Sequence, residues 1–181
     1  MRSLMKDEDE TAHIIHNMAK IFRNSLVWRK DMVTLKEELE FIYCFLEIQK
    51  YRFGDKIDYV VRAEESDLAV LIPKMSVVTF VENASIHGIE PLKQGGKIEV
   101  DIKRIGDNLM CSIRDNGVGM SSEKVQKLYR YMENEEEMGE RIGIQNVIYR
   151  LRMYYKERLS LNISSMPGEG TEIILIIPVD R

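Results

Sequence analysis

The chain has 181 residues, of which 44% are hydrophobic and 31% are charged. These proportions are typical of globular proteins, so they predict a folded core and exclude wholesale disorder. The formal net charge of −4 at pH 7 argues against nucleic acid as a main partner, because phosphate backbones bind basic surfaces. The two cysteines, Cys44 and Cys111, lie in unrelated contexts, so we expect neither a zinc site nor a disulfide framework.

The compartment that these features favour is the cytoplasm. Two isolated cysteines are compatible with a reducing environment. The longest apolar run, at 173–177, is too short to cross a bilayer, and no secretory signal peptide opens the sequence. We therefore expect a cytoplasmic domain.

Helices are predicted in the first third of the chain. Apolar residues at helical spacing predict one helix at 10–29. A second helix is expected to begin at Thr34, because Thr34 and Glu37 have the spacing of a capping box, and to end at Gly54. A strand at 56–62 follows, and then a third helix at 73–87 with Pro73 in its first turn.

Neighbouring strands alternate with helices in the remainder of the chain. The pattern predicts strands at 97–104 and 109–114, helices at 122–131 and 142–155, and strands at 159–165 and 171–179. The segment 133–140 is acidic and is expected to be mobile. Paired adjacent strands favour an α+β fold, a two-layer sandwich with a mixed sheet and helices on one face.

Three polar residues recur four apart in the third predicted helix. Thr79, Asn83 and His87 share one helical face, and Glu82 lies beside it. Polar groups in an apolar helix need partners or a pocket, and an Asn oxygen is a ligand that Mg²⁺ accepts beside phosphates. The alternative is a solvated helix edge that ends in a His-Gly cap.

A glycine-rich segment, Asp115-Asn116-Gly117-Val118-Gly119-Met120, follows a predicted strand. A buried Asp at a strand end accepts a hydrogen bond from an exocyclic amine such as that of adenine, which guanine does not offer there. Gly117 and Gly119 allow the backbone to approach a flat base. The alternative is a hairpin turn, although the residues from Ser121 onward resemble the start of a helix.

Two further glycine motifs follow. Gly139 to Gly143 opens a helix, where free backbone N–H groups favour anions, although a plain helix start has the same pattern. Gly168-Glu169-Gly170-Thr171 fits a hairpin between two strands, with Thr171 available to a ligand.

The order and spacing of these motifs resemble the GHKL ATPase superfamily over residues 73–178. The upstream segment 34–57, with Ile72-Pro73 and Glu82-Asn83-Ala84, resembles the LytS/YesM-type sensor histidine kinases, and this likeness extends from about residue 10 to the C-terminus. The resemblance implies an ATP-binding fold with a flexible lid. It further implies that Asn83 binds Mg²⁺ and that Glu82 and His87 line the phosphate end.

By the same resemblance, Asp115 binds the adenine amine. The other nucleotide-binding positions that it implies are Gly117, Gly119 and Met120 around the base, Gly139, Arg141, Gly143 and Ile144 in and after the lid, and Gly170 and Thr171 behind the adenine.

Three departures from the family pattern stand out. Ile86 replaces the usual Lys before the His of the first motif, and Arg141 replaces a lid glycine. The chain contains no Pro-His-Phe-Leu-type phosphoacceptor segment, and His13 and His16 are expected on a helix surface. We therefore expect residues 1–33 to be part of a dimerisation and phosphotransfer helix that lacks the acceptor, and residues 34–181 to be the catalytic domain.

The resemblance implies an ATP-dependent protein-histidine kinase that transfers the γ-phosphate to a histidine outside this chain. Its implied partners are that histidine helix and a response regulator, and its parent is implied to be a homodimer in the bacterial cell membrane. Two alternatives stay open: a nucleotide-binding interaction module with little catalysis, favoured by Ile86 and Arg141, and an ATP hydrolase, favoured by Glu82.

Overall fold

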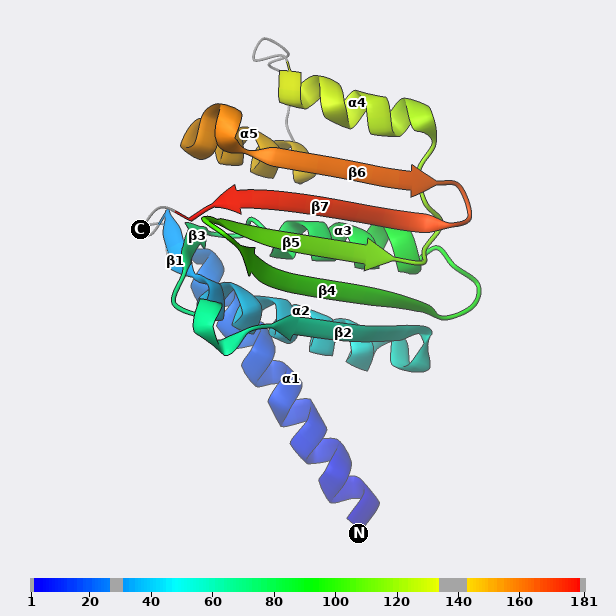
Figure 1. Ribbon diagram of the computed structural model, residues 1–181. Coiled ribbons are helices and arrows are strands. Elements are labelled where there is room, and N and C mark those ends of the chain that lie inside the picture. The colour runs from blue at the N-terminus through cyan, green and yellow to red at the C-terminus, as the bar shows by residue number, and fades with distance from the viewer. Residues whose placement is uncertain (1, 27–30, 134–142, 180–181) are drawn as a thin grey trace.

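The computed structural model describes residues 2–26, 31–133 and 143–179 (Figure 1). Five strands form one mixed sheet in the spatial order β2-β4-β5-β7-β6. Their bounds are β2 (Ile57–Ala63), β4 (Gly96–Ile105), β5 (Asn108–Asp115), β6 (Ser160–Met166) and β7 (Gly170–Pro178). β2 and β4 are parallel, and the other neighbouring pairs are antiparallel.

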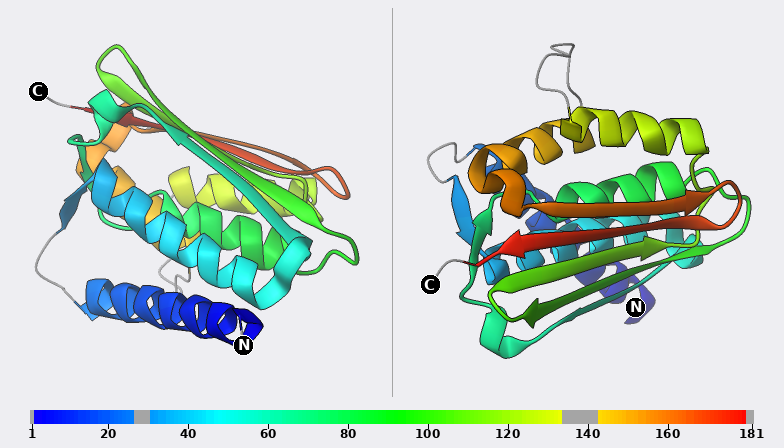
Figure 2. Two further views of the ribbon diagram at one scale, coloured as in Figure 1. Left: turned by 90° about the horizontal axis from the view of Figure 1, so that it is seen from below. Right: turned by 45° about the horizontal axis from the view of Figure 1, so that its top comes forward.

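The helices pack on one face of this sheet, as Figure 2 shows. They are α2 (Leu35–Phe53), α3 (Val78–Asn83), α4 (Ser122–Glu133) and α5 (Ile144–Tyr155). The long helix α1 (Arg2–Leu26) lies outside this layer and packs along α2 (Figure 2). The predicted α+β sandwich with a mixed sheet and helices on one face is confirmed.

The core lies between the sheet and the helix layer. Alternate residues of β5 show this directly, since Leu109, Cys111 and Ile113 are buried while the intervening side chains are partly or fully exposed. This period of two indicates a sheet with one covered face. The core continues into α2 and α3, where Leu35, Ile42 and Phe80 have no exposed surface.

Local signals placed α2 correctly. The side chain of Thr34 accepts a hydrogen bond from Glu37 N at 3.2 Å, and the Glu37 carboxylate accepts from Thr34 N at 2.8 Å. The predicted end at Gly54 is also confirmed, since Gly54 has a φ of 59° and its N–H donates to Lys50 O. The other boundaries that lie within the described residues differ from prediction by a few residues, except at α1 and α3.

Pro73 does not begin the third helix. It ends β3 (Leu71–Pro73), which pairs antiparallel with β1 (Met32–Thr34) in a small second sheet. α3 begins at Val78 and continues into a π-helical turn, η3 (Ala84–Ile89), in which Glu90 N donates to Ser85 O at 2.9 Å. The predicted helix is therefore shorter at its start, because β1 holds residues 71–73 extended.

Three short 3₁₀ turns complete the described elements: η1 (Gly54–Lys56), η2 (Glu65–Asp67) and η4 (Lys156–Arg158). α1 begins eight residues earlier than predicted, and the predicted end of that helix falls partly outside the described residues, as does most of the acidic segment 133–140. His13 and His16 are both exposed on α1, which confirms their predicted position on a helix surface.

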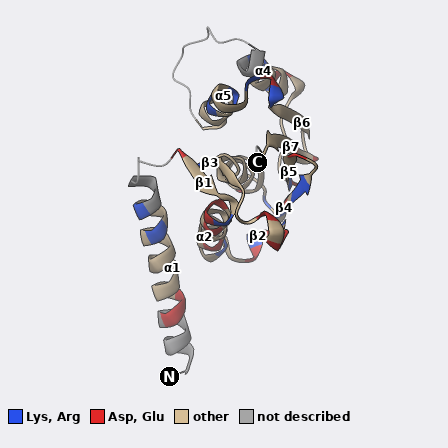
Figure 3. Cartoon of the chain, turned by 60° about the vertical axis from the view of Figure 1, so that its left-hand side comes forward, with Lys and Arg blue, Asp and Glu red and all other residues tan. Residues whose placement is uncertain are grey.

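Both basic and acidic residues are found along the described helices and strands, as the colours of Figure 3 show. The mildly acidic balance of the whole sequence is consistent with this pattern. A search of the described residues finds no helix with the length and apolar character needed to span a bilayer.

Candidate nucleotide-binding site

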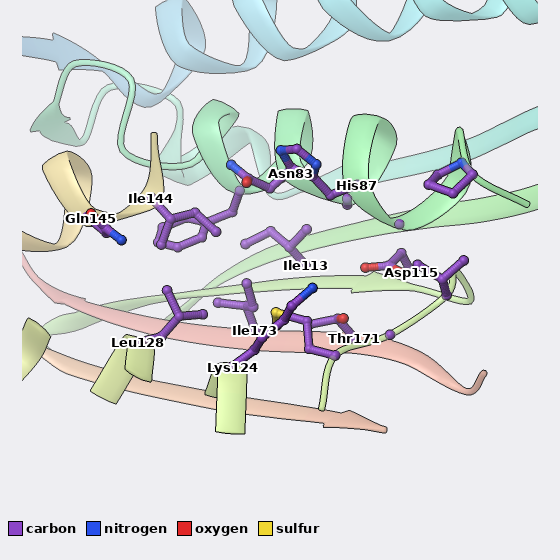
Figure 4. A pocket seen from close by; sticks show the side chains of 17 residues that line it. Asn83, His87, Ile113, Asp115, Lys124, Leu128, Ile144, Gln145, Thr171 and Ile173 are labelled. Carbon is purple, nitrogen blue, oxygen red and sulfur yellow. The ribbon is translucent and has the colours of Figure 1, made fainter. Parts of the chain in front are cut away.

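A cavity of about 490 Å³ opens between α3 with η3, the end of β5, and helices α4 and α5 (Figure 4). Its volume lies in the range of small-molecule sites. Its lining consists of Phe80, Asn83, Ala84, His87, Gly88, Pro91, Ile113, Asp115, Val118, Gly119, Met120, Lys124, Leu128, Ile144, Gln145, Thr171 and Ile173. Segments from 80 to 173 in the sequence thus converge on one space.

Asp115 supplies the buried carboxylate of this cavity. It ends β5 beside Thr171 of β7, and its side chain is 6% exposed. One oxygen, Oδ1, accepts a hydrogen bond from Gly117 N at 2.8 Å. Burial raises the pKa of Asp115 to about 6, although hydrogen bonds from the backbone N–H groups of Gly117 and Thr171 act against the rise.

Close backbone packing holds Asp115 in place. A Cβ atom at Gly88 would lie 2.7 Å from Asp115 Oδ1, and one at Gly117 would lie 2.4 Å from the Gly88 carbonyl carbon. Both contacts are shorter than real Cβ atoms make, so the carboxylate and the two backbones approach one another only because both residues are glycine.

The loop after β5 is fixed at both ends. Val118 N donates to Gly88 O at 3.0 Å, and Gly168 N donates to Val118 O at 2.8 Å. Met120 N donates to Ser165 Oγ at 2.8 Å, which ties the loop to β6. The loop leads into α4, so the alternative of a hairpin turn at 115–120 is wrong. It crosses from η3 to the β6–β7 hairpin.

Two glycines predicted beneath the base have different positions. Gly119 lines the cavity with a φ of 65°, and a Cβ there would lie 1.9 Å from Met166 O. Gly117 supports the wall from behind, since it packs on Gly88 and does not line the cavity.

Gly170 likewise supports the site by packing on the Asp115 carbonyl, whereas its neighbour Thr171 lines the cavity.

The predicted polar face of the third helix divides into two parts. Asn83 and His87 line the cavity, and Asn83 Nδ2 donates to Thr79 O at 2.7 Å, so the amide oxygen remains as an acceptor (Figure 4). Thr79 is buried, and its hydroxyl donates to Met75 O at 3.0 Å. Glu82 is absent from the cavity lining described here. Burial, followed by the Glu38 carboxylate, raises the pKa of Glu82.

The start of α5 lies across the cavity from α3. Gly143 precedes the helix with a φ of 64°, and a Cβ atom there would lie 4.0 Å from Asn83 Nδ2. Ile144 and Gln145 line the cavity. Gly139 and Arg141, the predicted lid positions, lie outside the described residues.

Sequence reasoning missed the apolar floor and one cation. Ile113 and Ile173 come from neighbouring strands, and Leu128 comes from α4 (Figure 4). Phe80 of α3 also lines the cavity. Lys124 also lines the cavity and precedes Leu128 by four residues. Helical spacing places the two side chains on one face of α4, and this signal was present in the sequence.

A metal ion at this site would need ligands from the nucleotide. Among the described residues, no cluster of three or more His, Cys, Asp or Glu side chains is placed to hold a metal. Mg²⁺ often takes one or two protein oxygens together with phosphate and water oxygens. The amide oxygen of Asn83 fits that pattern.

Family comparisons agree with this geometry. The family described as "Histidine kinase-, DNA gyrase B-, and HSP90-like ATPase" matches residues 74–181, and a family described as "Histidine kinase" matches residues 1–57. The chain therefore belongs to the histidine kinase-, DNA gyrase B- and HSP90-like ATPase family. Within this family it is an ATP-binding catalytic domain of the sensor histidine kinase type.

Curated relatives support that narrower class. The chain is 29% identical over 180 residues to sensor histidine kinase YpdA of Escherichia coli (strain K12), which covers 99% of this chain and 30% of the relative. It is 26% identical over 171 residues to sensor histidine kinase YesM of Bacillus subtilis (strain 168), which covers 94% of this chain and 28% of the relative. The chain thus spans less than a third of the length of either relative.

Solved structures share the fold. The catalytic domain of histidine kinase ThkA matches with a TM-score of 0.58 and 17% identity, covering 82% of this chain and 96% of that domain. A histidine kinase domain from the blue-light activated kinase of Erythrobacter litoralis matches with a TM-score of 0.57 and 14% identity, covering 94% of this chain and 75% of that one.

Proposed function

We propose that this chain binds Mg·ATP in the described cavity and positions the γ-phosphate for transfer to a histidine of its parent protein. The observation that carries this proposal is the buried carboxylate of Asp115 at one end of a cavity whose other wall presents the amide of Asn83. Phosphoryl transfer depends mainly on positioning and charge neutralisation, which a metal and fixed donors supply.

The adenine binds at the Asp115 end. Asp115 Oδ1 is occupied by the Gly117 N–H, so Oδ2 accepts from the exocyclic amine. The base lies on the apolar floor of Ile113 and Ile173, between walls that include Met120. Gly119 and Thr171 border the base, and Gly117 and Gly170 act from behind as backbone supports.

The phosphates lie toward Asn83 and the start of α5. Asn83 contributes its amide oxygen to Mg²⁺, and His87 lines the same wall. The free N–H groups at the beginning of α5, near Gly143 and Ile144, favour anions. Lys124 supplies a positive charge from the opposite side, which offsets the replacement of the usual Lys by Ile86.

The acceptor is a histidine on a helix outside this chain. Residues 1–33 form a partial dimerisation and phosphotransfer segment, and residues 34–181 form the catalytic domain. Exposed apolar side chains on α1, namely Ile15, Met18 and Phe22, support a parent that is a homodimer. A response regulator then receives the phosphoryl group, and the parent resides in the cell membrane.

The hydrolase alternative has less support. It depends on Glu82 activating a water next to the γ-phosphate, but Glu82 does not contribute to the described lining of the cavity. Histidine phosphorylation needs no such base at that position, because the acceptor histidine is itself the nucleophile.

Titration calorimetry with Mg·ATP and Mg·GTP tests the site. We expect saturable binding of ATP and at least tenfold weaker binding of GTP, because guanine offers no amine to Asp115. Asp115→Asn should weaken ATP binding at least tenfold, since an amide presents an unmatched donor to the base.

A test of transfer follows the binding test. The same chain, mixed with a histidine-bearing helix of its parent and labelled ATP, should transfer label to that helix. Equal affinity for ATP and GTP, or an unchanged Asp115→Asn variant, would contradict the placement of the base. Binding without transfer would favour the interaction-module alternative, and phosphate release without any helix would favour the hydrolase.

A further inference from the structure

The helix that carries Asn83 begins without a cap of its own. The residue before α3 is Val77, and no side chain at that position bonds to the first N–H groups. A helix start leaves four backbone N–H groups without intrahelical acceptors, and burying them unpaired is costly. Val77 and Val78 have no exposed surface, so water does not satisfy this end.

Glu38 supplies the missing cap from α2. Its Oε1 accepts from Val77 N at 2.9 Å and from Val78 N at 3.1 Å, and its Oε2 accepts from Met75 N at 2.9 Å. The side chain is 2% exposed, so it is expensive to bury as a carboxylate unless these donors compensate. Burial raises the pKa of Glu38, while the three amide donors and then the Arg150 guanidinium act against the rise.

The same turn is contacted from α5. Arg150 donates from Nη2 to Lys74 O, one residue before Met75. Met75 has a φ of 58°, a conformation that a side chain rarely adopts and that its surroundings must therefore impose. The turn 74–78 is thus held by a carboxylate of α2 and a guanidinium of α5, the two helices on either side of α3.

A short chain of contacts connects this turn to the site. Met75 O accepts from the hydroxyl of Thr79, and Thr79 O accepts from the amide nitrogen of Asn83. α3 is only six residues long and Asn83 is its last residue. A displacement of the start of α3 should therefore also displace Asn83.

We infer that Glu38 is a positioning residue: its carboxylate fixes the start of α3, and thereby the amide of Asn83, at the place where a nucleotide-bound Mg²⁺ needs an oxygen ligand. The inference rests on the proposed function of Asn83. It means that α2, the helix on which α1 packs, holds the metal side of the cavity in place. The adenine side is held separately, because Asp115 belongs to β5.

The test compares nucleotide affinity with and without Mg²⁺ in the full chain. We expect Glu38→Gln, which keeps the shape and removes the charge, to weaken Mg·ATP binding about tenfold, because the Asn83 oxygen is then held less firmly at the metal position. The affinity for ATP in the presence of a chelator should change less than about twofold. Glu38→Asp keeps a carboxylate on a shorter side chain. Its loss of Mg·ATP affinity should lie between those of wild type and Glu38→Gln, and its affinity for metal-free ATP should not change.

Asp67→Asn is the matched control. Asp67 is also 2% exposed, but it belongs to η2 and its described hydrogen bonds join it only to Glu64 and Val70, not to α3. Its substitution should therefore leave both affinities unchanged even if the chain becomes less stable. Thermal unfolding establishes that each variant is folded, and if Glu38→Gln does not fold, Glu38→Asp decides by the same comparison.

Three outcomes count against the inference. An unchanged Mg·ATP affinity in the folded Glu38 variants contradicts the positioning role of Glu38. An equal loss of ATP affinity with and without metal contradicts it too. Neither result contradicts the proposed nucleotide site. A wild-type chain that binds ATP equally with and without Mg²⁺ contradicts the proposed role of Asn83 and the inference with it.

Discussion

Asp115 has a structural cost and a functional use. A carboxylate that is 6% exposed has lost most of its hydration, and the hydrogen bonds from the backbone N–H groups of Gly117 and Thr171 offset only part of this loss. A ligand with an amine can donate a hydrogen bond to the other carboxylate oxygen, Oδ2, and so offset the rest of the lost hydration. The free domain therefore carries a group that destabilises it at neutral pH, as expected where a binding site needs an unsatisfied acceptor.

The pH dependence of stability should report this group. The folded-state pKa of Asp115 is about 6, above its ordinary value of 3.8. Between these values the folded state binds more protons, so the carboxyl group favours folding at low pH and opposes it as pH rises through 6. Going from pH 5 to 7.5, the unfolding free energy of Asp115→Asn relative to wild type should shift by about 1 kcal/mol in favour of the variant.

Urea unfolding at the two pH values measures this shift. Buried groups common to both chains, such as Glu38, cancel in the difference. Asp107→Asn, at the exposed turn between β4 and β5, is the control and should show a smaller shift. A wild-type-to-variant difference that is the same at both pH values would mean that Asp115 is not desolvated in the free protein.

At the scale of elements, the start of α2 offers the clearest energetic test. The reciprocal bonds between Thr34 and Glu37 satisfy backbone donors at this end. Thr34→Ala should lower the unfolding free energy by about 1 kcal/mol, whereas Thr34→Ser, which keeps the hydroxyl, should change it by much less. Urea unfolding of both variants provides the measurement. A Thr34→Ala variant as stable as wild type would mean that this cap does not stabilise the domain.

The caps of α2 and α3 show which features could be predicted from the sequence. The cap of α2 was predictable because both partners lie within four residues and have a recognisable spacing. The cap of α3 was not, because Glu38 is about forty residues away and nothing local marks it as an acceptor. The pairing of β1 with β3 was missed for a similar reason, since three-residue strands carry almost no alternation.

Within the site, the glycine and polar motifs were predictable and the apolar lining was not. Asn83, His87 and Asp115 reach one cavity, as their spacing and the family resemblance predicted. Ile113 and Ile173 look like any strand residue in the sequence, and only the sheet register places them together. The family resemblance implied that Glu82 lies at the phosphate end of the site, whereas Glu82 is not among the residues that line the described cavity.

At the scale of the whole molecule, α1 is attached to the catalytic domain rather than built into it. Its described contacts with α2 include three polar ones: Asn17 donates to Glu47 at 2.5 Å, His13 contacts the same carboxylate at 2.9 Å, and Lys20 pairs with Glu40. Ile14 is buried outside the main core, which begins at Val33, and Ile21 is the α1 side chain that packs partly buried against that core. The boundary near residue 33 stays a prediction.

A shortened chain tests that boundary. Every residue that lines the cavity lies between Phe80 and Ile173, so a chain that begins at Asp31 should unfold cooperatively and bind Mg·ATP within about twofold of the full chain. Its start retains β1 and the Thr34 cap. A chain that begins at Leu35 loses both and should be less stable by at least the value of that cap, about 1 kcal/mol. If the chain from Asp31 folds but binds ATP much more weakly, α1 contributes to the site through α2, and the path through Glu38 is where that contribution would act.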